Sequence, residues 1–124
     1  MVLDQLDPGA LLSRTYQLPA GPRVRLRLAR RSDLPALRAL LEQRGVEASA
    51  LALERLVRYD PRHRLVLCAT APLSGTEAIV GVGAIELDGR TLEPDTVVVD
   101  DRLTDGLADL LAAALVGRAG RRVA

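Results

Sequence analysis

The stretch 96-TVVVDDRLTDGLADLLAAALVGRA-119 decides the fold of this 124-residue chain. Val97–Val99 is a run of β-branched residues, which is typical of a strand covered on both faces. After the acidic turn Asp100–Asp105, apolar residues recur with helical spacing and predict one buried stripe, formed by Leu103, Leu107, Leu110, Leu111, Ala114 and Leu115. A strand that enters a helix through a tight turn directs several backbone N–H groups toward one place, where nucleotide pyrophosphates often bind.

The composition indicates a single globular domain. Apolar residues make up 48% of the chain and charged residues 27%. Aromatic residues make up only 2%, so the chain lacks a platform on which bases could stack. The net charge is +1 with acids and bases interleaved, which favours neither nucleic acid nor an anionic membrane surface as a partner.

The cellular location is predicted from what the sequence lacks. No segment approaches the roughly 18 apolar residues that a membrane-spanning helix needs, and the first residues do not resemble a secretory signal. The single cysteine excludes an internal disulfide and suits a reducing compartment. We therefore expect a soluble, cytoplasmic protein.

Three further strands are predicted outward from this stretch. Arg23–Leu28 alternates polar and apolar residues, Arg64–Thr70 is a compact apolar run, and Ala78–Leu87 is a longer one. Gly81 and Gly83 within the last run indicate a bulge or a close backbone approach. Asp88-Gly89 is a typical hairpin signal, and APLSGT at 71–76 is predicted to be a turn.

Two helices are predicted between the first and second strands. Ser32-Asp33-Leu34-Pro35 is a helix start, and Gly45 ends the helix. A second helix is predicted over Ala48–Tyr59. Residues 1–22 are weakly patterned and are interpreted as an N-terminal arm, with residues 23–124 as one domain. The predicted fold class is α/β (α+β), a mostly antiparallel four-stranded sheet flanked by helices.

The sequence resembles the GCN5-related N-acetyltransferase (GNAT) superfamily in three blocks. RLRLARRSDLPALRALL at 25–41 is similar to the first strand and helix of that family, and IVGVGAIEL at 79–87 is similar to its third strand. Residues 96–115 resemble its fourth strand and acyl-CoA helix. The resemblance implies an acyl-CoA N-acyltransferase-like fold, with acetyl-CoA or another acyl-CoA as cofactor.

In that family the loop after the fourth strand reads Gln/Arg-x-x-Gly-x-Gly/Ala and holds the coenzyme A pyrophosphate. Gly106-Leu107-Ala108 matches the last three positions, whereas Leu103 stands at the basic position and Arg102 lies one residue earlier. The resemblance thus implies a cofactor site formed by Val98, Val99, Arg102, Leu103, Thr104, Asp105, Gly106, Leu107 and Ala108. Carboxylates in the turn repel a pyrophosphate by on the order of 1 kcal/mol or more each, so the sequence predicts a weakened, degenerate site.

The family pattern continues beyond the matched blocks with further strands and a helix, which usually carry a tyrosine acid. The printed sequence stops at Ala124, so we expect the C-terminal half of the fold to be missing. Glu86 and Glu93 are the nearest candidates for a general base, and a solvated glutamate is the alternative for each. No cluster of His, Cys and carboxylates has metal-ligand spacing, so no metal is predicted.

Three other features have both a functional and a structural interpretation. Arg23, Arg25 and Arg27 on one strand face form either a phosphate track or a solvated face, and the solvated face is favoured because no aromatic or lysine-rich segment extends the row. Cys68 is interpreted as a buried core residue rather than a nucleophile. His63 is interpreted as an exposed loop residue.

Two hypotheses for the function therefore follow. The first is an acyl-CoA-dependent N-acyltransferase domain, degenerate and with weak or no activity. The second is a non-catalytic interaction domain. The run Val97–Val99 is predicted to lie at a sheet edge, where unpaired backbone groups are a template for another strand. We therefore expect a homodimer, with a protein partner that supplies the missing half as a further possibility.

Overall fold

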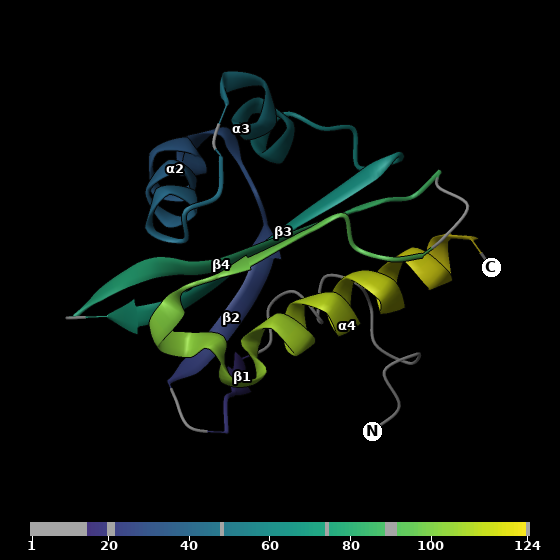
Figure 1. Ribbon diagram of the computed structural model, residues 1–124. Coiled ribbons are helices and arrows are strands. Elements are labelled where there is room, and N and C mark those ends of the chain that lie inside the picture. The colour runs from purple at the N-terminus through teal and green to yellow at the C-terminus, as the bar shows by residue number, and fades with distance from the viewer. Residues whose placement is uncertain (1–14, 20–21, 48, 74, 89–91, 124) are drawn as a thin grey trace.

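A computed structural model describes residues 15–19, 22–47, 49–73, 75–88 and 92–123 of the chain, with backbone alone at 104, 105 and 121–123. These residues form a five-stranded sheet with helices on both faces (Figure 1). The strands are β1 (Thr15–Gln17), β2 (Arg23–Leu28), β3 (Arg64–Leu73), β4 (Thr76–Glu86) and β5 (Thr96–Val99). The α-helices are α2 (Leu34–Gln43), α3 (Ala50–Val57) and α4 (Thr104–Val123), and short 3-10 turns, η2 (Arg31–Asp33) and η3 (Asp101–Leu103), precede α2 and α4.

The sheet follows chain order, β1-β2-β3-β4-β5, and every neighbouring pair is antiparallel. The expected count of four strands was wrong because β1 comes from the segment that was assigned to the arm. Tyr16 pairs with Val24, and the adjacent Leu18 is buried. A three-residue strand is too short to show the alternation of polar and apolar residues that marks a strand in the sequence. Its pairing with β2 and the burial of Leu18 hold it in the sheet. Residues 1–14 of the predicted arm lie outside the described residues.

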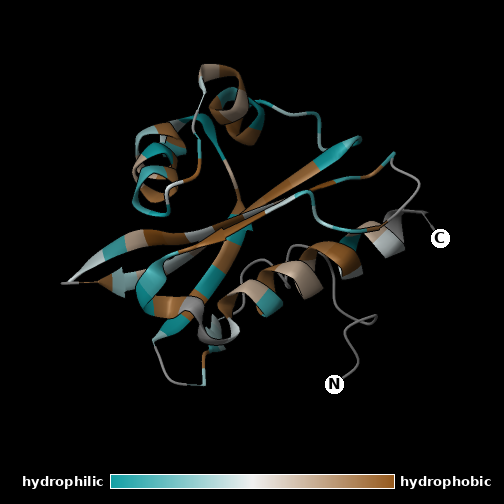
Figure 2. Cartoon of the chain, viewed as in Figure 1, coloured by the Kyte–Doolittle hydropathy of each residue, from teal (hydrophilic) through white to brown (hydrophobic). Residues whose placement is uncertain are grey.

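Two apolar cores lie on the two faces of the sheet (Figures 1 and 2). On one face, α2 and α3 bury apolar residues toward the sheet, among them Leu37 and Leu53. On the other, every fourth residue of the stripe is buried, Leu103 from η3 and Leu107, Leu111, Leu115 and Ala119 from α4. The side-chain oxygen of Ser49 accepts a hydrogen bond from the N–H of Ala52 and so begins α3.

The glycines of β4 let α4 approach the sheet, as the sequence indicated. A Cβ at Gly81 would lie 3.0 Å from Leu111 Cδ1, and one at Gly83 would lie 2.8 Å from Leu115 Cδ1. The register between β3 and β4 also shifts by one residue, because Ala69 pairs with Gly81 whereas Thr70 pairs with Ile79, so the irregularity lies next to Gly81. The β3–β4 turn is tighter than predicted, because β3 continues to Leu73 and β4 already begins at Thr76. The close approach of α4 to Gly81 and Gly83 holds this helix, and with it the β5–α4 turn, against the sheet.

Candidate functional site

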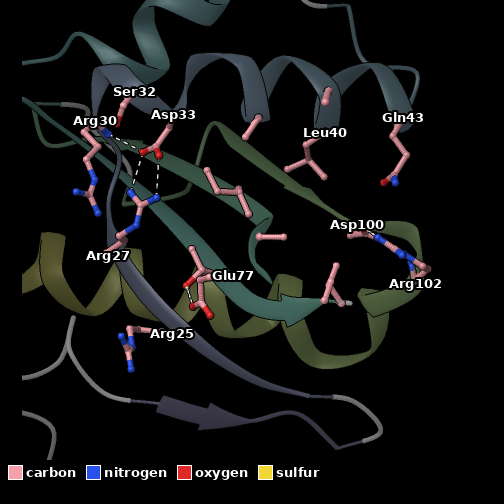
Figure 3. Close-up of a pocket in the computed structure, with 16 residues that line it drawn as sticks. Arg25, Arg27, Arg30, Ser32, Asp33, Leu40, Gln43, Glu77, Asp100 and Arg102 are labelled. Carbon is pink, nitrogen blue, oxygen red and sulfur yellow. Dashed lines mark hydrogen bonds and ion pairs between the residues drawn. The ribbon is translucent and has the colours of Figure 1, made fainter. Parts of the chain in front are cut away.

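A cavity of about 900 Å³ lies between α2 and the sheet (Figure 3). Its lining includes the aliphatic side chains of Leu40 from α2, Leu73 from β3 and Ile79 from β4. Its charged groups come from three segments that are far apart in sequence, 25–33, 77 and 100–102. They are Arg25, Arg27, Arg30, Asp33, Glu77, Asp100 and Arg102. The cavity therefore extends from the start of α2 to the β5–α4 turn.

A bidentate ion pair stands at the α2 end of the cavity. The guanidinium of Arg27 donates to both carboxylate oxygens of Asp33, at 2.8 and 2.7 Å, and the backbone N–H of Arg30 donates to Asp33 at 2.8 Å. Burial by itself raises the pKa of Asp33, but these donors outweigh it and hold that pKa below its usual value. Arg27 is therefore not part of a solvated arginine face, contrary to the favoured interpretation, because its partner is buried beneath α2.

A second pair closes the β5–α4 turn at the other end of the cavity. The buried carboxylate of Asp100 accepts from the backbone N–H of Arg102 at 2.9 Å, and from its Nε and Nη2 at 3.0 and 2.9 Å. The bonds from Arg102 lower the pKa of Asp100 well below its usual range, so Asp100 is ionised at neutral pH. The backbone carbonyl of Asp100 accepts the N–H of Leu103. Two N–H groups of the turn are thus already bonded within it.

Gly106 follows in the first turn of α4, with φ at +85°, a conformation that L side chains rarely adopt. A Cβ at this position would lie 3.0 Å from Cδ of Pro19. The chain segment after β1 is therefore packed against the turn at the residue that matches the glycine of the family loop. Gly106 is required both by its backbone conformation and by this contact.

Three charged groups of the cavity stand outside these two pairs. Thr70 Oγ1 donates to Glu77 Oε1 at 2.7 Å across the β3–β4 hairpin, and Glu77 Oε2 has no bond recorded among the described residues. Arg25 and Arg30 line the same cavity, and their guanidinium groups have no hydrogen-bond or ion-pair partner within the part of the chain that the structure describes. Figure 3 shows Arg27 between Arg30 and Arg25, with the Arg30 side chain directed away from Glu77.

The predicted cofactor residues divide into three groups. Arg102 lines the cavity, with most of its side chain exposed. Val98, Val99, Leu103 and Leu107 are buried in the two cores, and Ala108 is half-buried. For Thr104 and Asp105 only the backbone, at the start of α4, is described. Of the predicted set, the turn therefore presents backbone groups and the side chain of Arg102. The apolar residues of the set pack in the cores.

The two general-base candidates lie away from the cavity lining. Glu86 is at the far end of β4, where Oε1 accepts from Arg64 at 2.6 Å and from Arg55 at 3.1 Å. Glu93 is exposed in the segment before β5. The carboxylate that β4 does place in the cavity is Glu77, which the sequence analysis did not single out.

The interpretations of the cysteine and the histidine are confirmed. Cys68 is fully buried on the α2 side of β3, and burial raises the pKa of its thiol to about 12. His63 is exposed, with Nδ1 2.6 Å from a carboxylate oxygen of Asp88. Among the described residues, no three His, Cys, Asp or Glu side chains are grouped as a metal site would need. In the same residues no helix is long and apolar enough to cross a bilayer.

Comparison with known proteins supports the fold. No protein-family model matches the chain, and no curated protein matches it. Among solved structures, the GNAT domain of S. lividans PAT is similar, with a TM-score of 0.68 over 88% of this chain and 72% of that one. The sequence identity is 21%, so this similarity establishes the fold, a GNAT-like α+β arrangement. The resemblance seen in the sequence is thereby confirmed at the level of architecture.

Proposed function

We propose that the chain is an acyltransferase-type domain whose acyl-CoA site, at the β5–α4 turn, is degenerate, so that acyl-CoA binds weakly and acyl transfer to an amine is weak or absent. The GNAT-like fold supports the first half of this proposal. The contacts of Asp100 support the second half.

The bonding of Asp100 is the observation that carries the proposal. A pyrophosphate bound at a helix start needs free backbone N–H groups, and it gains from a nearby cation. Here the N–H and the guanidinium of Arg102 both donate to the Asp100 carboxylate. A pyrophosphate would have to displace this anion or bind beside it, and two anions a few ångströms apart repel by on the order of 1 kcal/mol or more.

The other turn residues do not fit a pyrophosphate any better. The N–H of Leu103 is bonded to the Asp100 carbonyl, and the space beside Gly106 is taken by Pro19. These groups complete and cover the start of α4. They serve the helix rather than a phosphate group, so we assign no catalytic step to the bound cofactor.

Calorimetric titration with coenzyme A and acetyl-CoA tests the proposal on the wild type, Asp100→Asn and Asp101→Asn. Each variant loses one negative charge from the same turn. Asp101 is the matched control, because it is exposed and its carboxylate has no bond recorded within the described residues. We expect millimolar or weaker binding by the wild type and by Asp101→Asn, and binding about ten-fold tighter by Asp100→Asn, equivalent to about 1.4 kcal/mol. Micromolar binding by the wild type contradicts the proposal, as does an equal gain in both variants.

A second candidate function is a non-catalytic homodimer. Within the described residues β5 is a sheet edge, since it pairs with β4 alone. An exposed edge is a template for a strand from a second copy or from a protein partner. Light scattering tests this on the wild type, Val97→Lys on β5 and the control Val116→Lys on the exposed side of α4. A dimer that only Val97→Lys dissociates supports edge pairing, and a wild-type monomer contradicts it.

A further inference from the structure

The cavity beneath α2 reaches the β5–α4 turn at one end, and its lining carries charges beyond those of the turn. Its lining carries four arginines and three carboxylates. The Arg27–Asp33 and Arg102–Asp100 pairs neutralise two of each. Outside these ion pairs are the guanidinium groups of Arg25 and Arg30 and the carboxylate of Glu77, of which Arg30 also attracts Asp33 and Glu77 also attracts Arg27.

The positions of these three groups are set by the sheet. Arg25 is the cross-strand partner of Thr70, and Thr70 donates its hydroxyl proton to Glu77 at 2.7 Å. Thr70 is itself buried, so it fixes one oxygen of Glu77 and leaves the other for a ligand. Arg30 directly precedes η2, and its own backbone N–H donates to the carboxylate of Asp33. Two cations and a carboxylate thus line one cavity.

The apolar lining of the cavity adds a second requirement. The apolar part of the lining consists of larger and smaller aliphatic residues, namely Leu40, Leu73, Ile79, Ala36, Ala39 and Ala78. This surface suits a short methylene chain better than a sugar or a base, which would need polar or aromatic neighbours. A ligand that matches the whole lining therefore has an aliphatic stem with charges at its ends.

We propose that the cavity binds a small amino acid that carries a second acidic group, with its two carboxylates on Arg25 and Arg30 and its ammonium on the free oxygen of Glu77. Guanidinium–carboxylate pairing is the strongest form of such recognition. The three protein charges sum to a net positive charge, which matches a ligand with two negative charges and one positive charge. Binding by this site does not depend on acyl-CoA, so it is separable from the function proposed above.

The test is a titration of the full chain, free of coenzyme A, with L-glutamate, L-glutamine and glutarate, followed by calorimetry. Glutamine lacks one carboxylate and glutarate lacks the ammonium, so each removes one of the proposed contacts. We expect L-glutamate to bind at least about ten-fold more tightly than either, since one charged contact is worth that much or more. Equal binding of the three compounds, or no binding of L-glutamate at millimolar concentration, overturns the proposal.

The variants Arg25→Ala, Arg30→Ala and Glu77→Gln identify the contacts. All three side chains are exposed, so the fold should tolerate their replacement. Each arginine variant should weaken L-glutamate binding about ten-fold or more. Glu77→Gln should weaken L-glutamate but not glutarate and so abolish the preference between them. A Glu77→Gln protein that keeps the preference overturns the assignment of the ammonium.

Arg23→Ala is the matched control. Arg23 belongs to the same strand and the same face as Arg25 but is not part of the cavity lining. Its removal changes the net charge equally and should leave the dissociation constant for L-glutamate unchanged. If Arg23→Ala weakens binding as much as Arg25→Ala, the attraction comes from overall charge and the site is refuted. Failure of the coenzyme A titration alone leaves this proposal standing, and the reverse also holds.

Discussion

Replacement of Asp33 by asparagine should destabilise the protein through Arg27. The Asp33 side chain is 7% exposed and that of Arg27 is 25% exposed. The carboxylate accepts two bonds from the guanidinium and one from the N–H of Arg30. Asparagine has a single acceptor oxygen, so it can keep the backbone bond but not the bidentate pair.

The cost follows from what Arg27 loses. Breaking a buried ion pair typically costs about 3–5 kcal/mol. A quarter of the Arg27 side chain reaches water, which reduces that figure to about 2 kcal/mol. For a chain of this length each kcal/mol lowers the midpoint of thermal unfolding by about 4 °C, so we expect a fall of about 8 °C.

The pH dependence of this loss gives it a specific signature. The pKa of Asp33 is below its usual value in the folded protein. The stabilisation is therefore complete above the unfolded pKa, about 3.9, and is lost as the pH falls through the folded value. Thermal unfolding of the wild type and Asp33→Asn should differ by the full amount at neutral pH, and by progressively less in acid.

Asp109→Asn, an exposed change on α4, is the control for this experiment and should have little effect at any pH. The reasoning is refuted if Asp33→Asn costs no more than Asp109→Asn at neutral pH. It is also refuted if the difference between Asp33→Asn and the wild type is the same in acid as at neutral pH.

Three further predictions concern packing and burial. Gly83→Val should lose about 1–3 kcal/mol in urea unfolding, because the new side chain meets Leu115, and an unchanged midpoint would show that α4 is not packed as described. Gly106→Ala should lose about 1 kcal/mol or more at φ +85°, whereas Gly117→Ala on the same helix, with open space around it, should gain about 0.5–1 kcal/mol in the same assay. The buried Cys68 thiol, with a pKa of about 12, should react with a thiol reagent at mildly alkaline pH only after unfolding, and rapid reaction of the native protein would contradict its burial.

The elements with a clear local period could be predicted from the sequence. Arg23–Leu28 is a strand at the expected bounds, because alternation over six residues is enough to define one buried face. The run of β-branched valines predicted β5, and the helical spacing of the leucines predicted α4. β1 could not be predicted, because its three residues form a strand through pairing with β2, a long-range contact.

The candidate site could be predicted only where it is local. The acidic turn was identified, because Asp100 and Arg102 are two residues apart and a turn brings them together. The cavity was not predicted, since it needs the packing of α2 over the sheet. Glu77 could not be predicted from the expected turn at 71–76, because the hairpin pairs Glu77 with Pro72 and its carboxylate reaches Thr70 from there.

The central claim is that Asp100 already occupies the donors that a pyrophosphate would use. Amide NMR spectra recorded during a titration with coenzyme A test it residue by residue. We expect the signals of Arg102 and Gly106 to stay in place in the wild type at concentrations below millimolar, and to move in Asp100→Asn. Movement of both signals in the wild type at micromolar coenzyme A would show that the turn is open to phosphate and would contradict the claim.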